Sequence, residues 1–191
     1  QATVQLGKLG VQSIVNSMGV FVSAAFAAVN RIDDFAYMPQ QNIAHAMTAL
    51  MAQNKGAKKT DRIKAAFRCG MKIELFYGIF IFFVCFFLAH PLMQLFSNDP
   101  VVCKHGVTYL KLISLMYLFP AVTNGVQGYF RGIGDLKITL ISSFVNMSVR
   151  VIFAAVLVFH FSLQIEALPF SYLAGWIGML LAEVPLLLRK F

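Results

Sequence analysis

The sequence predicts an all-α, polytopic membrane protein with six transmembrane helices. The 191-residue chain is 59% hydrophobic and 13% charged, whereas soluble domains carry about 25% charged residues. Its mean hydropathy is +0.72, and 19 of its residues are phenylalanine. A soluble fold of this size could not bury so much apolar surface, so the bilayer is the expected solvent.

Six apolar segments follow one another, separated by stretches rich in Asp, Asn, Pro and Gly. Residues 73–89 read IELFYGIFIFFVCFFLA, and Glu74 is their single charge. This segment, with its flanking residues, is long enough to cross a hydrocarbon core of about 30 Å. Because backbone groups in lipid must bond internally, each crossing is expected to be a helix. The expected helices are residues 1–28, 33–54, 72–90, 106–128, 137–160 and 168–188.

The distribution of basic residues predicts how the chain is oriented in the membrane. Residues 50–68, LMAQNKGAKKTDRIKAAFR, hold six Lys or Arg among nineteen residues, in the loop expected after the second helix. The connection after the fourth helix holds Arg131 and Lys137, and the C-terminus holds Arg189 and Lys190. Cytoplasmic loops are enriched in Lys and Arg, so both ends of the chain are expected in the cytoplasm. The basic run is then a topology signal that is compatible with anionic lipid, and nucleic acid is not an expected partner.

Polar residues recur at helical spacing inside the apolar segments, which places them on one face of each helix. These faces comprise Gln1, Gln5, Lys8, Gln12 and Asn16 in the first helix, and Asp34, Met38, Gln41, His45 and Thr48 in the second. Polar groups face lipid only at high cost, so both faces should point toward other helices or water. Interhelical hydrogen bonding and the wall of an aqueous cavity are both open interpretations.

Pro39 and Arg150 mark further structural or gating positions. Proline frees a backbone carbonyl and bends a helix, and breaks of this kind in transporters often lie beside a binding cavity. Arg150 is expected past the membrane midplane, where a guanidinium needs an anionic or carbonyl partner. Asp33, Asp34 and Glu166 are the candidate carboxylates, and a structural clamp and a substrate or gating role both remain open.

The chemistry of enzymes and metal sites is missing. The three cysteines lack CxxC spacing, so neither a zinc site nor a redox pair is expected. No carboxylate is expected at mid-depth, because Glu74 and Glu183 fall near cytoplasmic helix ends and Asp33 and Asp34 near an outer end. A carrier coupled to protons or sodium normally needs a buried carboxylate. Coupling would therefore use Asp34 or a site outside this chain.

Two short motifs carry a family resemblance, together with the stretches at 11–39, 51–62 and 125–137. Gln53, Asn54, Gly56 and Ala57 match a "GQN.GA" element in which Ala52 replaces the usual Gly, and Arg131, Gly132, Gly134, Asp135 and Lys137 match an "RG.GD.K" turn. The chain resembles the C-terminal half of a MATE (multidrug and toxin extrusion) transporter, closest to the DinF-like branch. The resemblance covers essentially the whole chain.

This resemblance implies a twelve-helix carrier made of two six-helix lobes around a central cavity. Such carriers exchange cationic or amphipathic drugs for protons or sodium by alternating access. The chain, which opens at Gln1 inside an apolar segment, is expected to be the C-terminal lobe of a longer protein. Its expected partners are membrane lipid, the N-terminal lobe and small-molecule substrates. No cofactor is expected, and the coupling ion, H⁺ or Na⁺, is expected to bind mainly in the N-terminal lobe.

Within this lobe, helical facing selects the candidate site residues. The expected substrate contacts are Gln12, Asn16, Tyr37, Met38, Gln41 and Asn124; Asp34, Pro39 and Arg150 are the structural or gating candidates; no catalytic or metal-binding residue is expected. One alternative is a lipid-linked oligosaccharide flippase, whose pyrophosphate cargo favours a cationic cavity, but Lys8 and Arg150 are the only candidate cations. The other is a non-transporting membrane scaffold, which leaves the polar faces unexplained.

Overall fold

The computed structural model describes the backbone of residues 2–190 and the side chains of residues 7–190. Its helices are α1 (Ala2–Asn16), α2 (Val20–Gly56), α3 (Thr60–Phe87), α4 (Ala89–Gln94), α5 (Pro100–Ser114), α6 (Leu118–Gly132), α7 (Leu136–Phe159) and α8 (Ala167–Leu188). Within the described backbone there is no strand, so the all-α prediction is confirmed.

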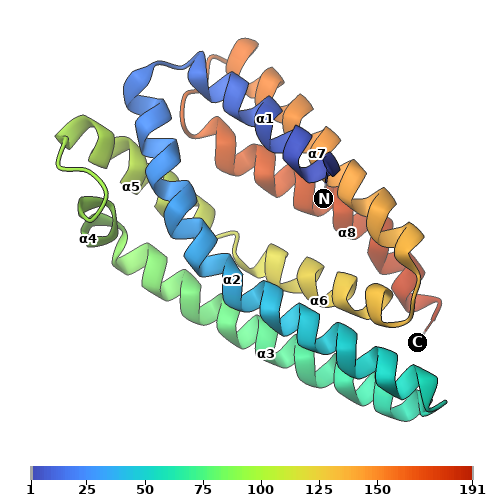
Figure 1. The fold of residues 1–191 in the computed structure, drawn as a ribbon. Helices are drawn as coiled ribbons and strands as arrows, with labels where there is room; N and C mark the ends of the chain where they lie inside the picture. Colours follow the sequence, from blue (N-terminus) through green and yellow to red (C-terminus); the bar gives the residue numbers. More distant parts are fainter. Residues whose placement is uncertain (1, 191) are drawn as a thin grey trace.

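The helices form two groups. α7 and α8 pair along their lengths and α1 lies against α7, while α2 packs against α3, α5 and α6 (Figure 1). Helix α6 also contacts α8 and so joins the two groups. One apolar cluster surrounds Phe26, Tyr109 and Trp176. A second cluster surrounds Met51 and Phe130 near the end of the lobe that carries the basic residues.

The first predicted connection, at residues 29–32, is wrong. The break lies at Ser17–Gly19, where Gly19 has φ +102°, and α2 then runs for 37 residues. This helix is about 55 Å long at 1.5 Å per residue. Asp33 lies 13 residues beyond Val20, about 20 Å along the axis. The expectation that Asp33 sits at an outer helix end is therefore also wrong, and α2 carries a carboxylate well inside its length.

The predicted loop after the second helix is also shorter than expected. Helix α3 begins at Thr60, so only residues 57–59 separate it from α2, and Lys58 has φ +58°. Most of the basic run is thus the end of α2 and the first turns of α3. Because α3 extends so far, Glu74 lies near the middle of the helix, and it is fully buried.

The helix predicted at 106–128 is divided into α5 and α6, whose axes differ by 52°. Pro120 cannot donate a backbone hydrogen bond, which favours a bend one turn before it. At the bend, backbone hydrogen bonds span three residues, including the one from Phe119 N to Met116 O at 2.9 Å. At the start of α5, Asp99 Oδ1 accepts from the backbone N of Val101 at 2.8 Å and caps the helix.

Among the described residues, α3, α7 and α8 are long and apolar enough to cross a membrane, and the bent pair α5–α6 qualifies as a fourth candidate if counted as one. The prediction of six crossings therefore remains a prediction. Helix α3 displays an exposed stripe of Phe76, Phe80, Phe83 and Phe87. A contiguous apolar surface of this kind suits contact with lipid.

Glycines bring α6 against α2. A Cβ added to Gly128 would lie 2.9 Å from Ala44 O, and one added to Gly132 would lie 3.0 Å from Thr48 O. Thr48 Oγ1 also donates a hydrogen bond to Gly128 O at 3.1 Å. Small residues at a spacing of four let membrane helices approach closely. This contact keeps the face of α2 that carries Asp33 packed against the neighbouring helices.

Candidate substrate face and buried charge cluster

Asp33 is a buried carboxylate in the interior of the lobe. Its side chain is 6% exposed, and the hydroxyl of Tyr117 donates a hydrogen bond to Asp33 Oδ1. Tyr117 precedes α6, so this bond connects α2 to the bend between α5 and α6. Sequence reasoning named Asp33 only as a possible partner of Arg150. Its position among Val29, Ile32 and Ala36, on the apolar stripe of α2, is the signal that could have identified it.

Arg150 approaches the same region from α7. Its guanidinium lies over the ring of Tyr172 in α8, and Arg150 and Asp33 are within range of a Coulombic interaction. No ion pair within 4.0 Å joins Arg150 to a carboxylate in the part of the chain whose side chains are described. Of the three carboxylates predicted as partners, Asp33 is the buried one, whereas Asp34 is exposed and Glu166 is half-buried.

Two further tyrosines complete the cluster. The ring of Tyr37 meets that of Tyr117 edge-on at 5.7 Å, and Tyr109 stacks on Phe26 at 5.8 Å. The hydroxyls of Tyr37 and Tyr109 are buried and have no hydrogen-bond partner among the described residues. We call Asp33, Tyr37, Tyr109, Tyr117, Arg150 and Tyr172 the buried charge cluster. The carboxylate and the two unpartnered hydroxyls supply oxygen atoms of the kind that hold a proton or a monovalent cation.

We expect Tyr117→Phe to lower the free energy of unfolding by about 1–3 kcal/mol, because it leaves a buried carboxylate oxygen without its donor. Thermal unfolding of the protein in detergent measures the effect. Tyr77→Phe is the matched control, since Tyr77 lies on α3 outside the cluster, with its ring beside Phe80. Equal melting temperatures for the two variants would show that the Tyr117 hydrogen bond carries no stability.

The predicted substrate contacts on α2 divide between the inside and the outside of the lobe. Tyr37 turns inward into the cluster, whereas Met38 is 58% exposed and Gln41 is exposed. We call Asp34, Met38, Gln41 and His45, all exposed, the polar face of α2. Pro39 lies within the continuous helix.

Two large apolar side chains of α2 are exposed away from the polar face. Phe35 is 74% exposed and Leu50 is 48% exposed. At about 100° per residue, these side chains lie about 100–160° around the helix from Asp34. Phe35 and Leu50 therefore lie on a different side of α2 from Met38 and Gln41.

The other predicted contacts lie on α1 and α6. Gln12 Nε2 donates a hydrogen bond to Asn16 Oδ1 at 2.9 Å, so these two residues form a pair on the last turns of α1. Asn124 is half-buried on α6, and Lys8 is exposed. Gln1 and Gln5, which share the predicted face of the first helix, lie outside the described side chains.

Two surface grooves lie at opposite ends of the lobe. One, of about 580 Å³, separates the end of α2 from the start of α3. The other, of about 500 Å³, lies between α4 and α5. None of the predicted substrate contacts lines either groove. The described residues also contain no group of three or more potential metal-binding side chains.

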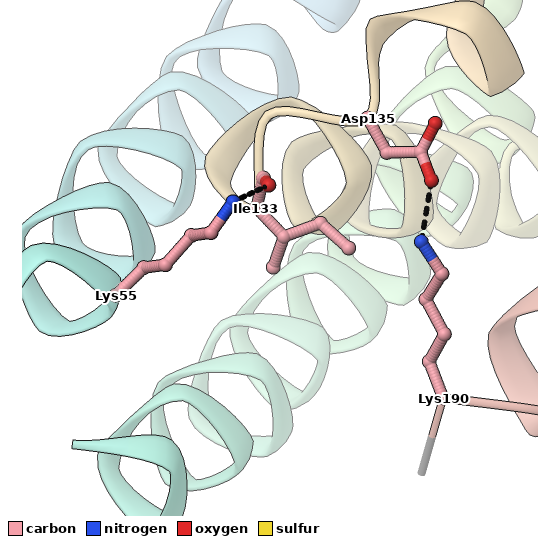
Figure 2. A network of polar contacts seen from close by, with 4 residues as sticks. All are labelled: Lys55, Ile133, Asp135 and Lys190. Atoms are coloured by element: carbon pink, nitrogen blue, oxygen red, sulfur yellow. Dashed lines mark hydrogen bonds and ion pairs between the residues drawn. The ribbon is translucent and has the colours of Figure 1, made fainter. Parts of the chain in front are cut away.

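The "RG.GD.K" turn is held from two sides (Figure 2). Lys55, at the end of α2, donates a hydrogen bond to Ile133 O, and Lys190 forms an ion pair with Asp135. Gly134 has φ +77°, a conformation that favours glycine at this position of the turn. The matched motif therefore links the end of α2, the α6–α7 connection and the C-terminal residues through these two contacts.

Two other carboxylates are buried at different helix contacts. Glu183 in α8 accepts a hydrogen bond from Ser142 Oγ in α7. Both oxygens of Glu74 are buried without a partner among the described residues. The prediction of no deep carboxylate is thus wrong for Glu74 as well as for Asp33, because the helix around each is longer than its apolar segment.

We expect Glu74→Leu and Glu183→Leu to have opposite effects on stability. Replacing the unpaired Glu74 by an apolar residue of similar size should raise the free energy of unfolding by about 1–3 kcal/mol. Glu183→Leu removes the acceptor of Ser142 and should lower it by about 1–3 kcal/mol. Thermal unfolding in detergent compares the two. A shift in the same direction for both variants would contradict this difference.

Comparison with known proteins places the chain in a family. The MatE family model matches residues 1–156. The chain belongs to the MatE family.

The chain is similar to curated relatives over most of its length. It is 25% identical over 175 residues to the probable multidrug resistance protein NorM of Thermotoga maritima, covering 90% of this chain and 36% of that protein. It is 27% identical over 176 residues to the probable multidrug resistance protein YoeA of Bacillus subtilis, covering 92% and 36%. The chain therefore spans about a third of the length of these curated relatives.

Solved structures agree on the MatE fold. An outward-facing multidrug resistance MATE transporter of the MOP superfamily superposes with a TM-score of 0.92 at 12% identity, covering 99% of this chain and 42% of the other. An inward-facing structure of a MATE transporter superposes with a TM-score of 0.83 at 17% identity, covering 98% and 44%. The predicted resemblance to MATE transporters is confirmed, the chain is a multi-pass membrane protein, and its place as a C-terminal lobe stays a prediction. The DinF-like branch stays a prediction.

Proposed function

We propose that this chain forms the C-terminal lobe of a secondary active multidrug transporter of the cell membrane. In this proposal the whole protein exports organic cations or amphipathic drugs in exchange for protons or sodium. The names of the curated relatives support the multidrug class. The observation that carries the exchange mechanism is the buried Asp33, which lies beside the polar face on the same helix.

Asp33 is the proposed ion-binding carboxylate of this lobe, in addition to any site in the N-terminal lobe. Tyr37 connects the two parts of the site, because it packs against Tyr117 on one side and precedes Met38 of the polar face. Met38 offers an adaptable apolar contact for varied substrates, and Gln41 offers hydrogen bonds. An ion bound at Asp33 and a cationic substrate beside it would repel each other, which favours exchange over joint transport.

Alternating access then requires the lobe to move against its N-terminal partner as a unit. The tight α2–α6 contact and the fastened "RG.GD.K" turn suit such a rigid movement. Both ends of the chain, and the basic turns, face the cytoplasm in this proposal. A flippase for pyrophosphate-linked cargo is less suitable, because Arg31 is the one basic residue of α2 within a turn of the polar face, and Asp34 lies beside it.

The test uses the full-length parent in proteoliposomes with an imposed proton or sodium gradient. Ethidium movement is followed by fluorescence. We expect uphill movement under one of the two gradients, and loss of this movement in Asp33→Asn. Asp61→Asn, at an exposed position in the first turn of α3, is expected to transport like the unmodified protein.

If neither gradient moves the dye, the antiport proposal fails, and a labelled lipid-linked sugar becomes the next substrate to examine. If the dye moves uphill equally well in Asp33→Asn, antiport stands but Asp33 is not its ion site in this lobe.

A further inference from the structure

The groove between α2 and α3 is basic and polar at one end and apolar at the other. It is lined by Leu50, Gln53, Asn54, Ala57, Lys59, Arg62, Ala65, Ala66 and Cys69. Two basic side chains and two amides gather at the connection between the helices, whereas the other end is formed by alanines, Leu50 and Cys69. Arg62 and Cys69 are seven residues apart on α3, which corresponds to about 10 Å along the helix.

This gradient follows the direction in which α3 enters the membrane. The apolar segment 73–89 begins just beyond Cys69. The basic end of the groove therefore lies farther from the apolar segment than the alanine end does. A ligand that fits both ends carries a negative charge at one end and a hydrocarbon chain at the other.

The basic end also offers backbone donors. The residue that precedes α3 is Lys59, and no side chain caps the first turn of this helix. The first amide groups of an uncapped helix lack internal acceptors and attract anions. Lys59 and Arg62 are both exposed and lie beside these amides. Charge-assisted hydrogen bonds to phosphate are the strong contacts that such a set can make.

We propose that this groove binds an anionic phospholipid of the adjacent membrane leaflet. Lys59 and Arg62 hold the phosphate, Gln53 and Asn54 bond the polar headgroup, and an acyl chain lies along Leu50, Ala66 and Cys69. A free phosphate compound would leave this apolar end without an occupant. The lipid joins α2 to α3 at the point where only residues 57–59 link them.

Cys69 provides a direct reporter, because it lines the groove and is exposed, whereas Cys85 and Cys103 are buried. The full-length parent is placed in nanodiscs of phosphatidylcholine with or without phosphatidylglycerol. The rate of maleimide labelling at Cys69 is then read by peptide mass spectrometry. We expect labelling to be about fivefold slower with phosphatidylglycerol, on the order of the attraction of one basic residue to an anionic surface.

Two double variants separate the groove from general surface charge. Lys59→Gln with Arg62→Gln should abolish the protection of Cys69. Lys58→Gln with Lys72→Gln removes the same charge from exposed positions that do not line the groove, and it should preserve the protection. Loss of protection in both double variants would overturn the proposal in favour of unspecific attraction.

Two further outcomes would also overturn it. Equal labelling rates in the two membranes, or no labelling in either, would mean that no anionic lipid occupies the groove or that another part of the parent chain covers it. Protection by inorganic phosphate or glycerol phosphate in pure phosphatidylcholine, equal to that by phosphatidylglycerol, would show that the groove recognises the phosphate group without the lipid chain.

Discussion

Arg150→Ala is expected to lower the free energy of unfolding by about 3–5 kcal/mol, whereas Lys8→Ala should change it by less than about 0.5 kcal/mol. The guanidinium of Arg150 covers the Tyr172 ring and lies within Coulombic range of Asp33, so its removal uncovers that ring and takes a positive charge away from a buried carboxylate. Lys8 is exposed on α1. The difference in unfolding free energy between the two variants therefore measures how much the buried charge cluster stabilises the fold.

Thermal unfolding of the full-length parent in detergent provides the comparison. Adding Asp33→Asn to Arg150→Ala should recover part of the lost stability, because the uncompensated charge is removed together with its partner. Equal melting temperatures for Arg150→Ala and Lys8→Ala would contradict a clamp at Arg150. A double variant less stable than Arg150→Ala alone would contradict the coupling with Asp33.

Gly128→Ala is the second substitution with a large expected effect, a loss of about 1–3 kcal/mol of unfolding free energy. Its new Cβ would lie 2.9 Å from Ala44 O. This neighbour is a backbone atom of α2, so relief requires the two helices to separate. Separation would also weaken the hydrogen bond from Thr48 Oγ1 to Gly128 O.

Gly56→Ala is the matched control, since nothing lies within 4 Å of the position where its Cβ would be added. It should change the free energy of unfolding by less than about 0.5 kcal/mol. Unfolding of both variants in detergent, followed by circular dichroism, measures the difference. Equal stability of the two alanine variants would show that the α2–α6 contact tolerates a wider separation than its geometry implies.

Several features of the fold follow from local sequence signals. The apolar segments predicted helices because backbone groups in lipid have no other partner. The spacing of Asp34, Met38 and Gln41 predicted a polar face, and all three side chains are exposed. The "RG.GD.K" motif was predicted as a turn, and residues 133–135 do connect α6 to α7, although the contacts of this turn with Lys55 and Lys190 depend on residues distant in the chain.

The features that sequence reasoning missed depend on contacts between helices. Asp33 was predicted at the outer end of the second helix because Asn30, Arg31, Asp33 and Asp34 are close together in the sequence. The helix continues through them, and the Tyr117 hydroxyl, 84 residues away in the chain, donates a hydrogen bond to Asp33. No periodicity in α2 reveals that partner. The break at Gly19 was missed because apolar residues continue on both sides of it.

The central claim is that the polar face of α2 lines a water-filled substrate path. Gln41→Cys and Phe35→Cys test it in the full-length parent carrying Cys69→Ala, because both positions are exposed on the same helix but on different sides. We predict that Gln41→Cys reacts with a membrane-impermeant thiol reagent and is protected by ethidium, while Phe35→Cys does not react. Reaction at Phe35→Cys together with an unreactive Gln41→Cys would contradict the account, because the polar face would then be buried or lipid-facing.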